Sequence, residues 1–455
     1  MFEFDDLAIE RAADAEAAAL IDAGARPGDS IGWLALNHPR ALALLRACGR
    51  LGLCFVPLNW RLAAPELAAI ARHAGLQRLW HDDAMQPLAE EVRALVELPQ
   101  RRADGHQTGD LMLVYTSGTT GEPKGAIHTA AAMQANIAAA IDAQGFDAST
   151  RTLAVLPLFH VGGLCIQVLP TLAAGGSVRL HARFDAAAWL RDVATWRPST
   201  SLLVPATMRA LVDHPDWAST DLSSLRFANT GSSIVPRSLI DAFHARGVPV
   251  CQVYGATETG PVSLVLRPHE ALAHPGRAGR PALGVEVRLV TGEVWIRGAN
   301  VARGYHREPD APAFAGGWFR SGDLATCDAD GFYEIVGRSM DLIISGGENI
   351  HPAEIENLAL ADPAVADAAV VGLPDARWGE VPVLALAARA GSAIDMDRLR
   401  RLFDAQLARY KHPRRIVVFE ALPKTALGKV RKGELVQMLE RDAGPAASQL
   451  SSAGG

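Results

Sequence analysis

The sequence has few cysteines, no long apolar run and no basic cluster, and each absence excludes a class of protein. None of the five cysteines lies in a CxxC pair, so we expect reduced, non-catalytic thiols. No stretch approaches the roughly 20 consecutive apolar residues that span a bilayer, so no integral membrane segment is expected. Lysine and arginine are spread along the chain, which gives no sign of a nucleic-acid surface.

The first residues, MFEFDDLAIERAAD, are acidic and have neither the basic start nor the apolar core of a secretory signal. With the reduced thiols, this predicts a cytoplasmic location. Hydrophobic residues make up 49% of the chain and charged residues 21%, which is typical of a folded globular protein. A chain of 455 residues has room for about three domains.

Short apolar strands alternate with helices over most of the chain, for example a helix at 7–24, a strand at 30–36 and a helix at 38–52. This order predicts largely parallel sheets covered by helices on both faces. Between 285 and 335 the pattern changes to short strands with Gly and Asp turns, which predicts a small antiparallel barrel or ribbon. We therefore expect an α/β protein. Its predicted parts are a large N-terminal domain of αβα layers with a small β-barrel subdomain (1–339), a small α+β C-terminal domain (340–440) and a disordered tail (441–455).

Residues 115–125 read YTSGTTGEPKG and follow the apolar run LMLV. Glycines let backbone N–H groups face a concavity, the hydroxyls add donors and Lys124 adds a positive charge, which suits a phosphate. The spacing differs from the nucleotide loop GxxxxGK[ST], because Gly125 follows the lysine. Taken alone, the segment leaves open a Gly/Thr hairpin that binds nothing.

Five segments, in a fixed order from about residue 30 to 440, resemble the motifs of the acyl-adenylate-forming superfamily. This superfamily includes acyl- and aryl-CoA synthetases, peptide-synthetase adenylation domains and luciferases. The segments are YTSGTTGEPKG, PLFHVGG at 157–163, YGATETG at 254–260, SGDLATCDADGFYEIVGR at 321–338 and PKTALGKVRK at 423–432. The resemblance implies that a carboxylate attacks the α-phosphorus of ATP to give an acyl-adenylate and pyrophosphate, after which a thiol displaces AMP. Because the two anions repel each other, such a site needs Mg²⁺ and cationic side chains.

The resemblance implies roles for individual residues. Lys429 would reach the acyl carboxylate and the α-phosphate, Glu258 would help to hold Mg²⁺, and Thr257 would contact the α-phosphate. Asp323 would accept hydrogen bonds from the ribose hydroxyls, beside Arg338. The other positions implied to contact ATP or AMP are Thr116, Ser117, Gly118, Thr119, Thr120, Lys124, Gly231, Ser232, Tyr254 and Gly255.

The same resemblance implies an acyl pocket and a CoA site. His160, grouped with the catalytic residues, would line the pocket as a gate rather than act as acid or base. The pocket would also use Val161, Gly162, Gly163, Gly255 and Pro261. CoA would meet Gly346, Gly347, Trp378, Tyr410, Lys411 and His412, although a solvated basic turn stays open for the stretch around Lys411. Met340 occupies the hinge, where relatives usually carry Asp or Lys, and the small domain beyond it is expected to be mobile.

The sequence therefore predicts an AMP-forming acyl-CoA synthetase that uses ATP, Mg²⁺, CoA and a small carboxylic acid. Two alternatives remain: an enzyme that loads a carrier protein's phosphopantetheine, and a catalytically weak binding homologue. The intact Lys429, Glu258, Asp323 and Lys124 argue against the homologue, and the DARWGE and YKHPRR stretches favour free CoA. The compact length resembles o-succinylbenzoate-CoA ligases, whereas GGENIHPAEIE and DARWGE resemble aryl-CoA and medium- to long-chain ligases. The acid is not fixed by the sequence, and a homodimer stays open as the assembly.

Overall fold

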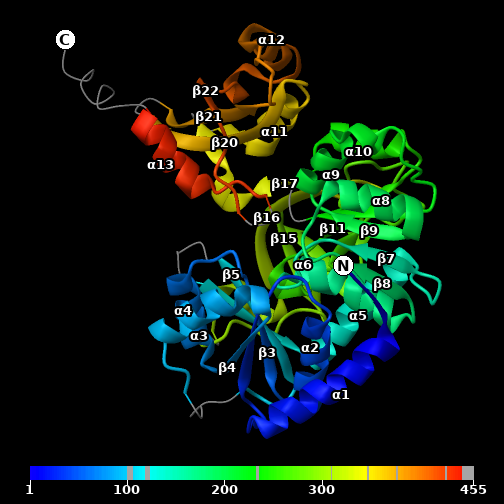
Figure 1. Cartoon of the computed structure of the whole chain (residues 1–455). Helices are drawn as coiled ribbons and strands as arrows, with labels where there is room; N and C mark the ends of the chain where they lie inside the picture. Colours follow the sequence, from blue (N-terminus) through cyan, green and yellow to red (C-terminus); the bar gives the residue numbers. More distant parts are fainter. Residues whose placement is uncertain are drawn as a thin grey trace, which may run out of the picture. The chain divides into compact units, whose positions relative to one another are not determined.

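In the computed structural model (Figure 1), the chain folds into two compact units. The first contains residues 1–232, 239–321 and 327–334, and the second contains 233–238, 322–326 and 335–455. None of the helices that the structure describes is long and apolar enough to cross a membrane. The structure describes residues 1–99, 106–117, 123–231, 235–308, 310–345, 348–375, 378–425 and 428–442.

A five-stranded sheet in the first unit runs in the order β4-β2-β3-β5-β6, parallel except for the antiparallel pair β5–β6. Alternate residues of its strands face different cores: Phe55 packs with helices α1 and α2, whereas Cys54 and Val56 pack with α3 and α4. This is the αβα layering that the sequence predicts. The strands are β2 (Ser30–Leu34), β3 (Cys54–Leu58), β4 (Leu76–His81), β5 (Asp110–Ser117) and β6 (Pro123–Thr129). The helices are α1 (Asp6–Asp22), α2 (Arg40–Leu51), α3 (Ala64–Ala74) and α4 (Gln86–Leu95).

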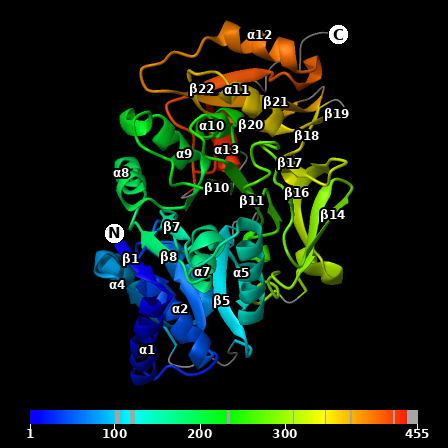
Figure 2. The same cartoon turned by 90° about the vertical axis from the view of Figure 1, so that its right-hand side faces the viewer.

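An eight-stranded sheet in the same unit runs β1-β8-β7-β9-β10-β11-β12-β13, with a parallel centre from β8 to β11. Helices α5 and α7 lie side by side along it (Figure 2). The strands are β1 (Phe2–Asp5), β7 (Arg151–Ala154), β8 (Ser177–Leu180), β9 (Thr200–Leu203), β10 (Phe227–Gly231), β11 (Val250–Tyr254), β12 (Leu264–Val265) and β13 (Arg280–Pro281). The helices are α5 (Ala130–Gln144), α6 (Val161–Gly163), the π-helical segment η2 (Leu164–Val168), α7 (Leu169–Ala173), α8 (Ala186–Trp196), α9 (Pro205–Val212) and α10 (Arg237–His244).

The segment predicted as a small barrel or ribbon is a four-stranded sheet in the order β14-β15-β16-β17. Its first two strands form an antiparallel hairpin. Thr291 and Gly292 turn that hairpin with φ values of 50° and 86°, the left-handed conformation that matches the twist of two-residue hairpins. The strands are β14 (Val285–Val290), β15 (Glu293–Gly298), β16 (Phe319–Cys327) and β17 (Tyr333–Arg338).

The second unit has the predicted α+β character and is built round strand β21, which pairs with β18, β20 and β22. Helices α11 and α12 cover one side of this sheet and α13 covers the other. The strands are β18 (Ile343–Ser345), β19 (Glu348–Ile350), β20 (Val365–Asp375), β21 (Gly379–Ala388) and β22 (Arg415–Phe419). The helices are α11 (Pro352–Leu360), α12 (Met396–Gln406) and α13 (Lys432–Asp442). Because α13 extends to Asp442, only 443–455 of the predicted tail lie outside the described residues.

All five cysteines are free thiols, as expected from their spacing. Cys48, Cys54, Cys165 and Cys251 are buried, and Cys327 is exposed. Burial raises the pKa of the thiols of Cys48, Cys165 and Cys251, which keeps them protonated and unreactive.

Candidate functional site

The strands that flank the phosphate-loop motif, β5 and β6, form an antiparallel pair with Thr116 opposite Lys124 and Ser117 opposite Pro123. The Thr116 hydroxyl donates to the Lys124 carbonyl over 3.5 Å. Gly118, Thr119 and Thr120 lie outside the described residues. The sheet therefore fixes both ends of the motif and places the lysine at its second end.

The ammonium of Lys124 has two neighbours from a segment some 180 residues further on. Its Nζ lies 3.0 Å from Oε2 of Glu308, which is 184 positions away, and 5.1 Å from the centre of the Tyr305 ring. An isolated antiparallel β-bridge between Ala126 and Tyr305 holds the segment that contains Tyr305 and Glu308 next to β6. The two side chains of the ion pair are 29% and 42% exposed, so the pair contributes little to the stability of the fold.

Glu258 lies on the short 3₁₀ helix η4 (Thr257–Thr259) and is only 8% exposed. The Tyr305 hydroxyl donates a 2.6 Å hydrogen bond to its Oε1. Burial, and then the negative charge of Glu258, raise the pKa of Tyr305, so the phenol keeps the proton that it donates. Tyr305 is not among the residues predicted from the sequence, because no spacing rule connects residues 47 positions apart.

His128 lies on β6 beside η4 and has no exposed surface. Neither ring nitrogen makes a well-aligned hydrogen bond to the described residues, and an interaction with the Thr257 backbone only partly offsets the effect of burial on the pKa of the ring. Burial lowers its pKa to about 4, so the imidazole is neutral at physiological pH. The 3₁₀ helix that carries Thr257 and Glu258 is thus supported by a neutral ring.

Two of the glycines predicted to contact ATP or AMP lie at the same edge of the eight-stranded sheet. Gly231 ends β10, and a Cβ atom there would lie 2.5 Å from the Val253 carbonyl oxygen. Gly255 follows Tyr254 at the end of β11, and a Cβ atom there would lie 1.8 Å from the carbonyl oxygen of Pro261. Both positions require glycine for steric reasons. Ser232 lies outside the described residues.

Four of the predicted acyl-pocket residues, His160 to Gly163, lie at the start of α6, whereas Gly255 lies against Pro261 after β11. The His160 ring is 4.7 Å from that of Phe159, and burial followed by the positive charge of Arg61 lowers the pKa of His160 to about 4. The His160 ring is therefore neutral at physiological pH. Val161 is buried, and a Cβ atom at Gly162 would meet no described atom within 4 Å, so the chain borders open space there.

In the second unit, Asp323, Arg338 and Lys429 lie together. Arg338 Nε donates to Asp323 Oδ1 over 3.0 Å. Lys429 keeps an exposed face, yet desolvation lowers its pKa. The charge of Arg338 acts in the same direction, whereas Asp323 and Asp341 raise the pKa. Three residues drawn from two separate motifs are therefore neighbours.

In the second unit, the rings of Trp378 and Tyr410, two of the predicted CoA residues, each lie near a basic side chain. Arg414 lies 5.5 Å from the centre of the Trp378 ring, and the Lys411 Nζ lies 5.8 Å from that of Tyr410. Lys411 also pairs with Glu354. His412 differs, because its Nε2 lies 3.2 Å from the Leu407 carbonyl oxygen and its ring packs near Phe403. Gly346 and Gly347 lie outside the described residues, and Met340 is 62% exposed on a 3₁₀ turn.

No group of three or more His, Cys, Asp or Glu side chains that could hold a metal occurs in the part of the chain that the structure describes. Glu258 is the carboxylate that the sequence predicts to lie beside the triphosphate. Mg²⁺ is commonly bound by one or two carboxylates together with substrate phosphates and water. The residues present therefore fit a Mg²⁺ ion that arrives with ATP, rather than an ion held by protein alone.

Comparison with known proteins places this arrangement in a family. The family model described as AMP-binding enzyme matches residues 8–306, and the AMP-binding enzyme C-terminal domain matches 354–429. An indoleacetate–CoA ligase of Aromatoleum aromaticum is 40% identical over 465 residues, covering 93% of this chain and 91% of the relative. A feruloyl-CoA synthase of an Amycolatopsis species is 40% identical over 438 residues, covering 91% and 89%. The structure of o-succinylbenzoate coenzyme A synthetase from Bacillus subtilis with ATP and magnesium is 29% identical, covers 94% of this chain and 93% of that chain, and has a TM-score of 0.84.

Proposed function

Because the chain belongs to the AMP-binding enzyme family and is an AMP-forming acid–thiol ligase, we propose that it joins an aromatic carboxylic acid to coenzyme A. The observation that carries the choice of acid is the pair of 40% identical relatives, which act on indoleacetate and ferulate and align with this chain over about nine-tenths of its length. The open space beside Gly162, next to the neutral ring of His160, supports an apolar acyl group.

In the first half-reaction, a carboxylate oxygen of the acid bonds to the α-phosphorus of ATP while the bond to pyrophosphate breaks. Lys124 leaves Glu308 and binds the β- and γ-phosphates, and Lys429 neutralises charge at the carboxylate and the α-phosphate. Asp323, held by Arg338, accepts from the ribose hydroxyls. Glu258, oriented by Tyr305, would hold Mg²⁺, which supplies positive charge beside the phosphates.

In the second half-reaction, the sulfur of CoA bonds to the acyl carbonyl carbon, the bond to AMP breaks, and the thiol proton leaves to solvent. We propose that the domain beyond Met340 moves between the two steps, as a hinge at an exposed turn permits. Arg414 and Lys411, each beside an aromatic ring, supply positive charge and a stacking surface for the phosphorylated adenosine of CoA.

The experiment is an acid-dependent ATP–pyrophosphate exchange assay over a panel of aryl, arylacetic, medium-chain and long-chain acids, with the best acids then tested with different thiol acceptors. We expect exchange with aryl or arylacetic acids, and a thioester with free CoA. Exchange only with long-chain acids would contradict the aromatic assignment. Transfer to a phosphopantetheinylated carrier protein but not to CoA would contradict the assignment of CoA as the acceptor. Absence of ATP–pyrophosphate exchange with every acid would indicate a binding homologue.

A further inference from the structure

The order of strands in the eight-stranded sheet reverses at β7. Strand β7 has its successor β8 on one side and β9 on the other, and all three are parallel. The connections after β7 and β9 therefore leave in opposite directions. In open α/β sheets, ligands bind in the crevice outside the carboxyl ends of the strands at such a reversal.

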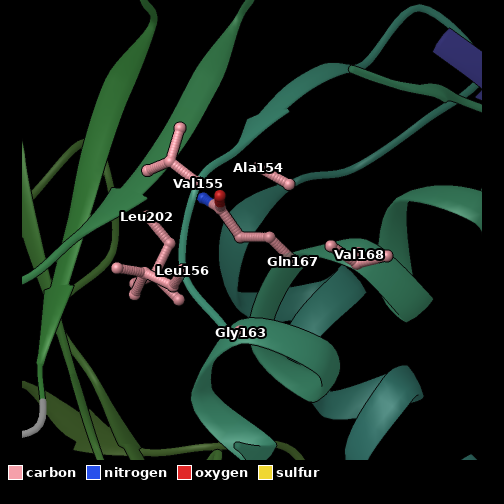
Figure 3. Close-up of a pocket in the computed structure, with 7 residues that line it drawn as sticks. All are labelled: Ala154, Val155, Leu156, Gly163, Gln167, Val168 and Leu202. Carbon is pink, nitrogen blue, oxygen red and sulfur yellow. The ribbon is translucent and has the colours of Figure 1, made fainter. Parts of the chain in front are cut away.

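A small cavity lies at this reversal (Figure 3). Its walls come from the residues at the end of β7, from β9, and from the helical segment that begins at α6. The lining residues are Ala154, Val155, Leu156, Gly163, Gln167, Val168 and Leu202. Gln167 is the one amide among apolar neighbours and glycine, and Gly163 also belongs to the predicted acyl pocket. The cavity has room for one water-sized group.

The Gln167 side chain is 2% exposed, and its amide nitrogen is committed to other residues. Nε2 donates to Thr200 Oγ1 over 2.8 Å and to Asn229 Oδ1. The orientation of Asn229 is set in turn, because its own Nδ2 donates to the Cys251 carbonyl. Flipping the Gln167 amide would place its oxygen against the Asn229 oxygen, so the orientation is fixed.

The other amide atom, Gln167 Oε1, is buried and has no hydrogen-bond partner among the described residues. Buried acceptors of this kind are uncommon, since the unpaired atom loses its hydration without compensation. The π-helical segment η2 carries the residue, and such segments occur often at functional sites. A donor that enters the cavity would complete the hydrogen bonding of the amide.

Resting on the proposed function, we propose that Gln167 determines specificity: its Oε1 accepts a hydrogen bond from an N–H or O–H group carried by the ring of the acid. The enzyme then prefers acids with such a donor over acids of the same shape without one. A site built to pair a substrate donor discriminates strongly against the analogue that lacks it, because the buried acceptor is left unpaired.

The test compares kcat/KM for pyrophosphate release within two pairs of acids, indole-3-acetate with benzofuran-3-acetate and 4-hydroxyphenylacetate with 4-fluorophenylacetate. We expect a preference of at least about tenfold for the donor-bearing acid in one pair. In Gln167→Met the preference should disappear, while the donor-free acid keeps its rate. Gln144→Met is the matched control, because Gln144 is also buried with an unpaired Oε1 but does not line the cavity.

Three results would overturn the proposal. Equal kcat/KM within both pairs for the unaltered protein would do so even if the variant fails to fold. An unchanged preference in Gln167→Met would show that the cavity holds only water or stays empty. If none of the four acids releases pyrophosphate while an aliphatic acid does, the aromatic assignment fails first and this proposal fails with it.

Discussion

The Tyr305 hydroxyl donates a 2.6 Å hydrogen bond to Oε1 of Glu258, across 47 positions of sequence. The same ring lies under the ammonium of Lys124, which pairs with Glu308. One tyrosine therefore connects the carboxylate proposed to hold Mg²⁺ with the lysine proposed to bind the phosphates. Each contact has a measurable consequence.

Tyr305→Phe removes the hydrogen bond but keeps the ring. A hydrogen bond to a charged group contributes about 2 kcal/mol, so kcat/KM for pyrophosphate release should fall by roughly tenfold or more. The Mg²⁺ concentration for half-maximal rate should rise, because Glu258 is no longer held in one orientation. Tyr333→Phe is the control, since its hydroxyl donates to the Val287 carbonyl of the four-stranded sheet. An unchanged Mg²⁺ dependence in Tyr305→Phe would contradict the role.

Glu308→Gln should strengthen ATP binding. In the structure Glu308 forms an ion pair with the Lys124 ammonium, to which the phosphates of ATP are proposed to bind. Breaking this partly exposed pair costs up to about 1 kcal/mol. The KM for ATP should therefore fall by up to about fivefold, whereas Lys124→Ala should raise it. Glu286→Gln removes a carboxylate from an exposed pair with Arg297 and should leave the KM unchanged. Equal KM values for Glu308→Gln and the unaltered protein would contradict the proposal that ATP replaces Glu308 at Lys124.

Neighbouring glycines at the start of α6 should respond differently to alanine. A Cβ atom at Gly162 meets no described atom within 4 Å, so Gly162→Ala should fold normally and lower kcat/KM for the bulkier acids. At Gly163 the Cβ atom would lie 2.2 Å from the Pro157 carbonyl oxygen, so Gly163→Ala should lower the free energy of unfolding by about 1–3 kcal/mol. Denaturant unfolding and acid-panel kinetics separate the two effects. Normal stability of Gly163→Ala would contradict the packing described.

The buried His128 should make folding stability fall in acid. Its pKa is about 4 in the folded protein against 6.5 for an unperturbed histidine, so between these values the unfolded chain binds the extra proton. The contribution of neutral, buried His128 to the free energy of unfolding is therefore fully present above pH 6.5 and is lost as the pH falls toward 4. From pH 7.5 to 5 the loss is about 2 kcal/mol. His128→Leu should remove this part of the pH dependence, as measured by urea unfolding at both pH values.

His269→Gln serves as the control for that measurement, because the His269 side chain is 76% exposed. It should leave the difference in unfolding free energy between the two pH values unchanged. If His128→Leu shows the same difference as the unaltered protein, the buried neutral state of His128 is wrong.

Much of the fold could be predicted because its signals are local. The alternation of strands and helices gave α1, β2 and α2 near their observed bounds. Strand β21 was not predicted. Its residues Leu384 and Leu386 face one hydrophobic core, while Val383 and Ala385 face the other. A strand buried on both faces has no alternation of polar and apolar residues to reveal it.

The site was predictable only where its residues lie in contiguous motifs. Lys124, Glu258 and Lys429 are each embedded in such a motif, and their proposed roles remain to be tested. Tyr305 and Glu308 reach Lys124 through the bridge at Ala126, a long-range pairing that leaves no mark on sequence spacing. The same holds for Gln167, whose free acceptor follows from hydrogen bonds to Thr200 and Asn229 on two other strands.

In the proposed mechanism, Lys429 acts in adenylate formation and not in thioester formation. Charge neutralisation at the carboxylate and α-phosphate predicts that Lys429→Ala lowers pyrophosphate release by about a hundredfold or more. The control is Lys432→Ala, a nearby lysine that pairs with Asp341 and Glu356. It should change pyrophosphate release little.

The most direct measurement compares both half-reactions in Lys429→Ala: pyrophosphate release from ATP and the acid, and thioester formation from CoA and a supplied acyl-adenylate. We expect pyrophosphate release to be nearly abolished, while thioester formation keeps most of its rate. Equal loss of both steps, or retention of both, would contradict this expectation.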